Sequence, residues 1–121
     1  MKLSTALLPP DSAGFLFVDT AQFRDAFCAD VPLDEANVAA ASQKPIAASA
    51  FGATLPVAAW KTIPSWYMVG RQDEAIPPSV ERAMVKHIGA HTVEIDSSHV
   101  PFISHPHAVV HLIEEAVHDT D

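Results

Sequence analysis

The stretch that decides the fold is residues 63–78, which read IPSWYMVGRQDEAIPP. Residues 65–69 form a short run rich in aromatic and branched side chains that ends at Gly70, and a helical pattern begins directly after the proline pair at 77–78. This order predicts a strand, a loop and a helix. Asp73 lies on the loop, where open α/β sheets place functional groups at the carboxyl ends of their strands.

A second strand pattern, residues 92–96, follows further along the chain and leads into the Ser-Ser-His run at 97–99. The first strand, residues 64–70, shows no alternation of polar and apolar side chains, which is typical of a parallel strand covered on both faces. An acid and a histidine, Asp73 and His99, are therefore expected at the carboxyl ends of two strands.

Each of these strands is followed by a predicted helix. The first helix runs from about residue 78 to 88, with Gly89 placed as its C-terminal cap, and the second from about 106 to 118. The inward stripe of the first helix is expected to consist of Val80, Ala83, Met84 and Ile88. The second helix carries a broad apolar arc that consists of Val109, Leu112, Ile113, Ala116 and Val117. Its histidines lie on the opposite face. Strands alternating with helices predict an α/β fold.

The first half of the chain gives weaker signals. Residues 1–14 are expected to form an extended lead-in, because they contain prolines and a glycine. The remaining expectations are a short strand at 15–18, helices at about 20–28 and 33–43, a short helix around 46–50 and a turn at 57–60. Only two strands of a core sheet are visible, and two such strands do not make a stable sheet alone. We therefore expect that hidden strands, or something outside the chain, complete the sheet.

Composition and charge restrict the function classes. The chain has 121 residues, of which 49% are hydrophobic and 18% charged, as in an ordinary soluble domain. The formal net charge of -8 and the scattered basic residues argue against nucleic acid or an anionic membrane as a partner. No run is apolar enough for a membrane span, and no signal-peptide core precedes Pro9. The single cysteine, Cys28, excludes an internal disulfide, and we expect a cytoplasmic protein.

Several motifs together resemble the C-terminal part of α/β-hydrolase-fold proteins: WKTIPSW at 60–66, Asp73 with AIPP at 75–78, Gly89-Ala90, SHVP at 98–101 and SHP at 104–106. The closest likeness is to small bacterial hydrolases of the esterase and hydroxynitrile-lyase-like type, over roughly residues 14–118. The resemblance implies a partial α/β-hydrolase fold, with two C-terminal parallel strands and flanking helices. It also divides the chain into the extended lead-in at 1–14, a helical cap-like segment at 15–55 and a C-terminal core portion at 56–121.

The same resemblance implies roles for the two residues at the strand ends. Asp73 matches the acid of the family's catalytic triad and His99 matches its histidine, which in acyl transfer takes the proton of a nucleophilic serine. Family members carry that serine on a G-x-S-x-G elbow. The glycines of this chain lie too far apart to form one: Gly14, Gly52, Gly70 and Gly89. We therefore expect the second half of a hydrolase, without the nucleophile and inactive as an isolated chain.

Other side chains have competing interpretations. Ser97, Ser98 and Ser104 lie near His99 in the sequence, yet none sits on a strand-to-helix elbow, so local hydrogen bonding is favoured over nucleophilic attack. Asp96 is an alternative acid, for which a turn contact is favoured because His99 follows it so closely.

Cysteine, histidine and aromatic residues add weaker candidates. Cys28 lies in a predicted helix without an activating base and is interpreted as a buried structural thiol. His107, His111 and Glu115 form a row at helical spacing that is conceivable for a divalent ion, but the polar face of an amphipathic helix is favoured. No metal and no other cofactor are therefore expected. Trp60, Trp66 and Phe102 are assigned to core packing. Alternatively, an acyl pocket is lined by Trp66 or by an aromatic residue of the cap-like segment, Phe23 or Phe27.

Three functions remain open. The first is a hydrolase fragment acting on a small ester-like substrate, in which Asp73 and His99 work only if a partner chain supplies the serine. The second is a non-catalytic protein whose exposed strand edge at residues 65–69 pairs with a second copy or a complementing chain. The third is a small-molecule binding module. Ester hydrolysis and cyanohydrin cleavage both fit the resemblance, because a fold alone does not choose the chemistry.

Overall fold

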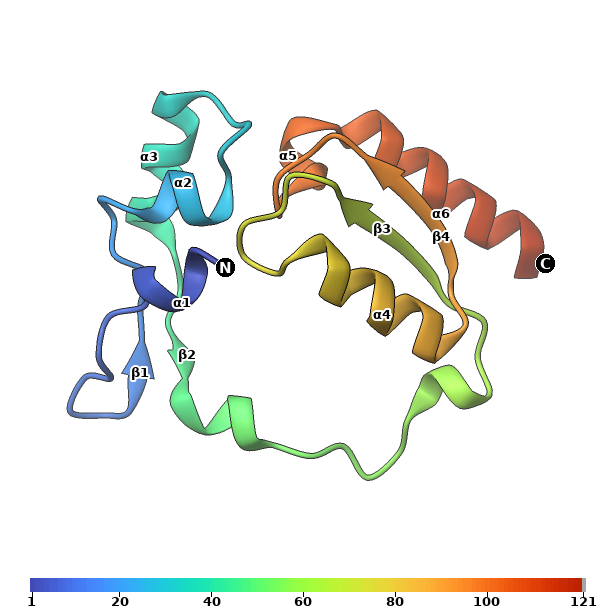
Figure 1. Cartoon of the computed structure of the whole chain (residues 1–121), viewed down its shortest axis with the longest axis horizontal. Coiled ribbons are helices and arrows are strands. Elements are labelled where there is room, and N and C mark those ends of the chain that lie inside the picture. The colour runs from blue at the N-terminus through green and yellow to red at the C-terminus, as the bar shows by residue number, and fades with distance from the viewer. Residues whose placement is uncertain (121) are drawn as a thin grey trace.

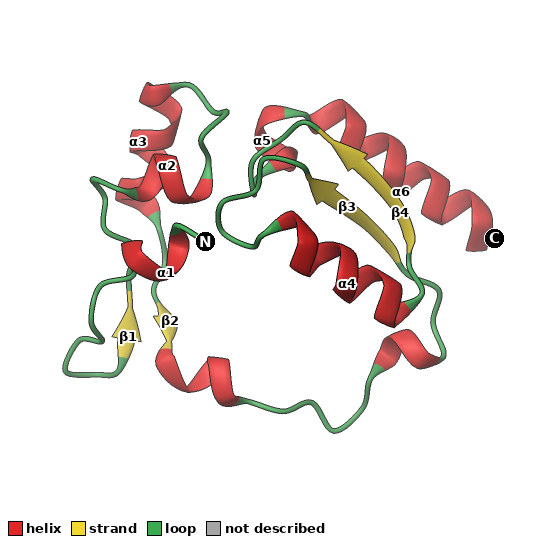
Figure 2. Cartoon of the chain, viewed as in Figure 1, coloured by secondary structure: helices red, strands yellow, loops and turns green. Residues whose placement is uncertain are grey.

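The computed structural model describes residues 1–120; Asp121, the last residue of the predicted C-terminal core portion, lies outside the described residues. Short helices and strands follow one another along the chain (Figure 2). In chain order they are α1 (Leu3–Ala6), β1 (Phe15–Leu16), α2 (Phe23–Phe27), α3 (Leu33–Ser42), β2 (Ile46–Ala47), the 3₁₀ helices η1 (Ala48–Gly52) and η2 (Ala59–Lys61), β3 (Trp66–Gly70), α4 (Pro78–Ile88), β4 (His91–Ile95), α5 (Pro101–Ser104) and α6 (Pro106–Thr120).

A pair of parallel strands forms the centre of the C-terminal half, as the sequence predicts. β3 and β4 are paired in parallel, beginning with Trp66 opposite His91. α4 and α6 lie on opposite sides of this strand pair (Figure 1). Successive side chains of a strand point to opposite faces, so Trp66 lies toward α6 whereas Tyr67 lies near Glu81 of α4. Coverage on both faces explains why the polar and apolar residues of β3 do not alternate.

The boundaries of the longer helices follow the prediction closely. α3 covers Leu33–Ser42 and α4 covers the predicted range Pro78–Ile88, while α6 runs two residues further than expected, to Thr120. Gly89 ends α4 with a φ of 68°, the left-handed conformation that a glycine cap supplies without steric cost. Local signals such as proline pairs and a capping glycine therefore determine these helix ends.

The predicted inward stripe of α4 is wrong. Glu81 and Val85 are the buried residues of the helix, whereas Val80 and Met84 are each 46% exposed. Ala83 is exposed as well. A sheet of two strands is too narrow to cover a broad apolar arc, so α4 turns one side to β3 and leaves most of its apolar side uncovered.

The apolar arc of α6 is covered only in part. Leu112 and Ala116 are half-buried, while Val110, Ile113 and Val117 are at least half exposed. The arc is present as predicted, but the two strands are narrower than the arc. The outer part of the helix therefore presents apolar side chains to solvent.

The N-terminal half departs furthest from the prediction. α1 occupies part of the lead-in that was expected to be extended, and its Ala6 is buried. Residues 46–47, expected in a short helix, instead form β2 and pair antiparallel with β1, while the helical turn begins only at Ala48. Segments this short have little conformational preference of their own, so pairing with a distant segment decides their structure. α5 also lies outside the predicted elements.

The strands of residues 1–120 form two separate two-stranded sheets, β1 with β2 and β3 with β4. No third strand lies beside β3 or β4 in this part of the chain, so each strand of the pair has one edge without a strand partner. None of the helices described here is both long enough and apolar enough to cross a lipid bilayer.

The buried core joins the two halves of the chain. Its members come from α2, α3 and their connection, together with one residue of the β4–α5 loop: Phe23, Cys28, Val31, Ala36, Ala40 and Val100. Val100 directly follows His99, so the α2–α3 segment packs against the loop that carries the histidine. At the chain's start, the backbone N–H of Lys2 donates to the carbonyl of Glu74 at 2.8 Å, beside Asp73.

Candidate active site

The loop after β3 holds Asp73 in a buried position. Asp73 is 5% exposed, and its Oδ1 accepts hydrogen bonds from the backbone N–H groups of Ala75, at 2.7 Å, and Ile76, at 2.9 Å. These are the bonds of an aspartate-stabilised turn. The turn fixes the carboxylate and leaves its Oδ2 free for another partner.

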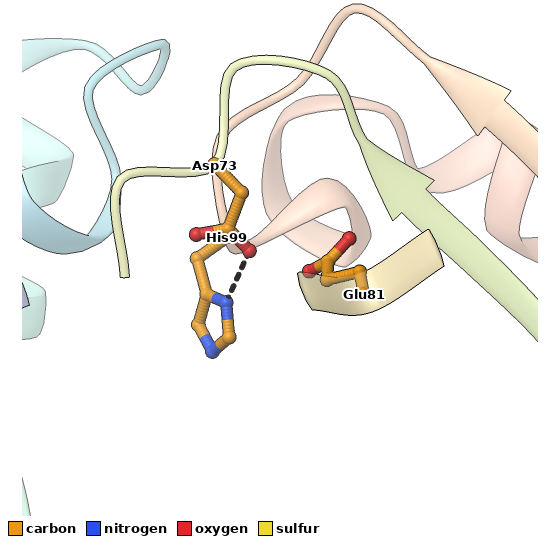
Figure 3. Close-up of side chains that lie close together, drawn as sticks. All are labelled: Asp73, Glu81 and His99. Carbon is orange, nitrogen blue, oxygen red and sulfur yellow. Dashed lines mark hydrogen bonds and ion pairs between the residues drawn. The ribbon is translucent and has the colours of Figure 1, made fainter. Parts of the chain in front are cut away.

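That partner is His99, as the resemblance implies. Nδ1 of His99 lies 2.6 Å from Oδ2 of Asp73, and the second ring nitrogen, Nε2, points away from the carboxylate (Figure 3). Because an ionised carboxylate only accepts, Nδ1 carries the proton and donates it to Asp73. Nε2 is then an unprotonated base, the tautomer that a general base requires.

A close approach of two backbones brings the two loops together. A Cβ placed on Gly70 would lie 2.7 Å from the carbonyl oxygen of Ser98 and 2.8 Å from that of Ser97. Distances this short exclude any side chain at position 70. The glycine at the end of β3 therefore lets the Asp73 loop and the His99 loop meet.

The α2–α3 segment anchors the histidine loop through Asp30. The Oγ of Ser98 donates to Asp30, and the backbone N–H of Ser98 donates to the same carboxylate at 3.1 Å. Burial acts to raise the pKa of Asp30, but hydrogen bonds from Ser98 and Ser104 outweigh it and hold the pKa below its usual value. Nothing in the sequence near Asp30 indicates this partner, which is far away along the chain.

Two of the three predicted pocket residues lie near the histidine. The ring of Phe27 has its centroid 4.9 Å from that of His99, and Phe23 contacts Phe27 at 5.3 Å. Both phenylalanines line an apolar cavity of about 560 Å³ that also includes Val18 and Leu7. Phe27 therefore places an apolar wall beside the candidate base.

The structure does not bring Trp66 to this site. Trp66 is the first residue of β3, at the opposite end of the strand from the Asp73 loop, and its indole stacks on the ring of His91 with centroids 4.8 Å apart. This placement matches core packing, the first of the two interpretations of Trp66.

The sequence interpretation missed a third acidic residue, Glu81. It is 3% exposed, and one ligand atom from each of Asp73, Glu81 and His99 lies within 4.8 Å of the others (Figure 3). Burial, then hydrogen bonding to Asp73 and the charge of Asp73, raise the pKa of Glu81 to about 7. A glutamate in the first turn of a helix is normally explained by its favourable interaction with the helix dipole. The position of Glu81 in the sequence therefore did not indicate a functional role. Glu81 lies one helical turn before Val85 on the same face of α4. A correct prediction of the buried face of α4 would therefore have identified Glu81 as a buried acid.

The geometry of these three residues fits a hydrogen-bonded cluster better than a metal site. Within residues 1–120 they are the one group of three acidic or thiol or imidazole side chains close enough to share an ion. Two ligands of a tetrahedral zinc ion, at normal bond lengths, lie about 3.3 Å apart. The 2.6 Å between Nδ1 of His99 and Oδ2 of Asp73 is a hydrogen-bond distance instead.

The predicted row on α6 does not form such a group. His111 makes an ion pair with Glu115 at 3.3 Å when it is protonated, and both side chains are largely exposed. His107 is exposed on the same helix. These residues therefore lie on the exposed polar face of α6, which is the interpretation that the sequence favoured.

The remaining candidates have local partners. The Oγ of Ser97 donates to the carbonyl of Ser98, and Ser104 lies 2.9 Å from Nδ1 of His105. Asp96 is exposed and pairs with Arg71 at 3.1 Å rather than with His99. Cys28 is 1% exposed, and burial raises the pKa of its thiol, as expected for a structural cysteine.

Comparison with known proteins identifies the family and the fold of the chain. None of the curated proteins matches the chain. Among solved structures, the crystal structure of the pyrethroid hydrolase PytH aligns with a TM-score of 0.70 and 22% identity, over 97% of this chain and 49% of that one. The chain therefore spans about half the length of that solved hydrolase, and a likeness at this identity concerns the fold. The sequence profile described as the alpha/beta hydrolase family matches residues 3–112, nearly the whole chain. Profile and fold together show that this chain belongs to the alpha/beta hydrolase family.

Proposed function

We propose that this chain supplies the base and the acid of a carboxylic-ester hydrolase of the bacterial esterase type, and that the nucleophilic serine comes from outside residues 1–121. The observation that carries the proposal is the bond between His99 and Asp73, in which a buried carboxylate holds Nδ1 and leaves Nε2 free. In acyl transfer this arrangement sets the tautomer and orientation of the base.

Each of the two residues has a defined step in this reaction. Nε2 of His99 takes the proton of the attacking serine hydroxyl and later returns it to the leaving alcohol. Asp73 stabilises the imidazolium that exists between these two steps. Water repeats the sequence on the acyl-enzyme, with His99 as the base again.

The partners of the nearby serines support an external nucleophile. Among residues 1–120, the hydroxyl of Ser98 is bound to Asp30, and that of Ser97 to the carbonyl of Ser98. The length of the solved hydrolase, about twice that of this chain, leaves room for a serine elbow in the unmatched half. That half belongs either to a longer polypeptide or to a second chain.

The apolar cavity lined by Phe27, whose ring contacts that of His99, favours an ester with an apolar group. Phe23 and Phe27 supply two aromatic walls, and the space of about 560 Å³ lies within the usual size range of small-molecule sites. A solved relative of this fold bears the name pyrethroid hydrolase, which favours ester hydrolysis over cyanohydrin cleavage. The free, buried Cys28 is compatible with the cytoplasm, the compartment that we propose.

Self-association is a second candidate function, favoured by the uncovered apolar surface. Val80 and Met84 of α4 are each 46% exposed, and they line an open groove of about 500 Å³ with Trp60. The free edge of β3 offers unpaired backbone groups to another strand. A homodimer, or a complex with the complementing half of the hydrolase, would cover both features.

Hydrolysis of p-nitrophenyl butyrate by the purified chain tests the catalytic proposal. We expect no burst from the isolated chain, and any slow, linear release of nitrophenol above the rate of buffer alone should disappear in His99→Ala and Asp73→Asn. His111→Ala, on the exposed face of α6, is the matched histidine control and retains the wild-type rate. A burst that is stoichiometric with the chain would reveal a nucleophile within these residues and overturn the external serine.

Complementation tests the same proposal with the full site. The gene's own upstream region, or a neighbouring gene, is searched for a G-x-S-x-G segment, which is then co-expressed with the chain. We expect a burst and turnover that both Ser→Ala at the elbow and His99→Ala reduce on the order of 10⁴-fold. Turnover of the complex that is indifferent to His99→Ala would remove His99 from the mechanism.

A further inference from the structure

Glu81 is a buried acid with no ion-pair partner among residues 1–120, although the nearby charge of Arg82 acts to lower its pKa. It lies 3% exposed in the first turn of α4, and its Oε2 is fully buried without a hydrogen-bond partner among residues 1–120. Buried carboxylates are normally paired or hydrogen-bonded, because an isolated charge is costly to desolvate. An unpartnered oxygen at this depth therefore indicates a carboxyl group that is not ionised.

The groups that face Glu81 explain its state. The β3–α4 loop contributes Asp73, the β4–α5 loop contributes His99, and β3 contributes Tyr67, whose pKa is raised by burial and by the charges of Glu81 and Asp73. The nearest cation on α4, Arg82, is engaged elsewhere, because its guanidinium donates to both carboxylate oxygens of Glu94 at 2.8 Å. Two carboxyl groups this close cannot both ionise without strong repulsion.

We propose that Glu81 is a positioning residue for the base and acid of the site: as a neutral acid, it shares its proton with Asp73 and holds that carboxylate against Nδ1 of His99. The catalytic role of Glu81 in this inference rests on the proposed function. The contact between Glu81 and Asp73 can be tested without a substrate. In Figure 3 Glu81 lies to one side of the Asp73–His99 pair, and one of its carboxylate oxygens is within 4.8 Å of a ligand atom of each.

The proposal divides the work around Asp73 among three partners. The backbone N–H groups of Ala75 and Ile76 hold Oδ1, and the imidazole N–H holds Oδ2. A proton on Glu81 supplies the remaining carboxylate contact without adding charge. When Glu81 ionises, this donor is lost and a second negative charge lies beside the carboxylate that holds Nδ1 of His99.

Carbon NMR of the chain labelled with ¹³C at the glutamate carboxyl groups tests the first half of the inference. The resonance that disappears in Glu81→Gln belongs to Glu81. We expect its titration midpoint near pH 7 in the wild-type chain and a lower midpoint in Asp73→Asn, where the charge of the neighbour is gone. A midpoint in the ordinary range of an exposed glutamate, or one that Asp73→Asn leaves unchanged, would overturn the proposal.

The proton resonance of Nδ1–H in His99, assigned by its loss in His99→Gln, tests the positioning role. We expect it at low field in the wild-type chain and in Glu81→Gln, which retains a donor, and shifted or broadened beyond detection in Glu81→Ala. Glu114→Gln, an exposed change on α6, is the control and leaves it unmoved. Circular dichroism verifies that the variants remain folded, and if Glu81→Ala does not fold, the carbon titration decides.

These readouts separate the inference from the proposed function. Both are measured without an ester, so a chain that never hydrolyses ester can still confirm the role of Glu81. Conversely, full esterase activity in the complemented site together with an ordinary midpoint for Glu81 would leave the proposed function intact and reject this inference.

Discussion

The carboxyl end of the β3–β4 pair and the outer sides of the helices α4 and α6 differ sharply in how much of their surface is buried. At the carboxyl end, Asp73 and Ser98 are buried, their polar atoms are hydrogen-bonded, and Val100 is enclosed by α2 and α3. Along the outer sides of α4 and α6, apolar side chains such as Met84 and Val117 remain about half exposed. The candidate site is therefore more deeply buried and more completely hydrogen-bonded than the outer faces of α4 and α6.

The site therefore depends on local hydrogen bonds and on contacts with the α2–α3 segment rather than on a wide sheet. Turn hydrogen bonds, one glycine and one distant aspartate hold the two loops together. Helix faces, in contrast, need a neighbouring layer to bury their apolar side chains, and two strands supply too little of it. Three substitutions and one pH series test this difference, and they follow in order of decreasing expected effect.

The largest effect is expected from Gly70→Ala at the crossing of the two loops. A Cβ at this position would lie 2.7 Å from a backbone carbonyl oxygen, and backbone cannot move aside as a flexible side chain can. We expect a loss of about 3 kcal/mol in the free energy of unfolding, measured by urea denaturation. Gly52→Ala, where a Cβ meets nothing within 4 Å, is the control and should change stability by less than about 0.5 kcal/mol. Equal effects at the two glycines would contradict the close approach.

The next largest effect is expected from Asp30→Ala, which removes the anchor of the histidine loop. Its carboxylate accepts two hydrogen bonds from Ser98, and bonds to a charged group contribute about 1.5 to 3 kcal/mol each. We expect a loss of roughly 2 kcal/mol and faster amide exchange at His99, because the loop loses its tie to the α2–α3 segment. Asp25→Ala, an exposed residue of α2, is the control. Unchanged exchange at His99 would show that packing of Val100 alone holds the loop.

Ionisation of Glu81 is expected to have a smaller effect, which is a dependence of the free energy of unfolding on pH. Its pKa is raised to about 7, so the folded chain binds this proton more tightly than the unfolded chain does. The contribution to stability is full below pH 4.5 and declines as the pH rises to about 7, by roughly 1 to 3 kcal/mol. Denaturation of Glu81→Gln across this range should lack that decline. A wild-type curve parallel to that of the variant would show that Glu81 titrates normally.

The smallest effect on stability is expected from Met84→Lys on the uncovered side of α4. Since this side chain is 46% exposed, its removal should change the free energy of unfolding by less than about 0.5 kcal/mol. Self-association should fall, because a charge now lies in the apolar groove, and sedimentation velocity measures this directly. Val38→Lys, an exposed change on α3, is the control. A wild-type chain that remains monomeric at micromolar concentration would reject the homodimer that we propose.

Part of this protein could be predicted because its signals are local. Prolines 77 and 78 and the capping Gly89 define α4, and the uninterrupted apolar run before Gly70 defines β3. Asp73 and His99 follow two adjacent parallel strands, so the sheet edge brings them together whatever the rest of the chain does.

The amino-acid sequence was thus enough to predict the order of β3, α4, β4 and α6 and to place Asp73 and His99 at one edge of the sheet, because both follow from neighbouring residues and from the geometry of parallel strands. Three features emerged only from the folded chain: Asp30 anchors Ser98, β1 pairs with β2, and α4 turns Glu81 inward. These outcomes depend on which surfaces meet across long stretches of chain, and an apolar pattern cannot tell a face that is covered here from a face that awaits a partner.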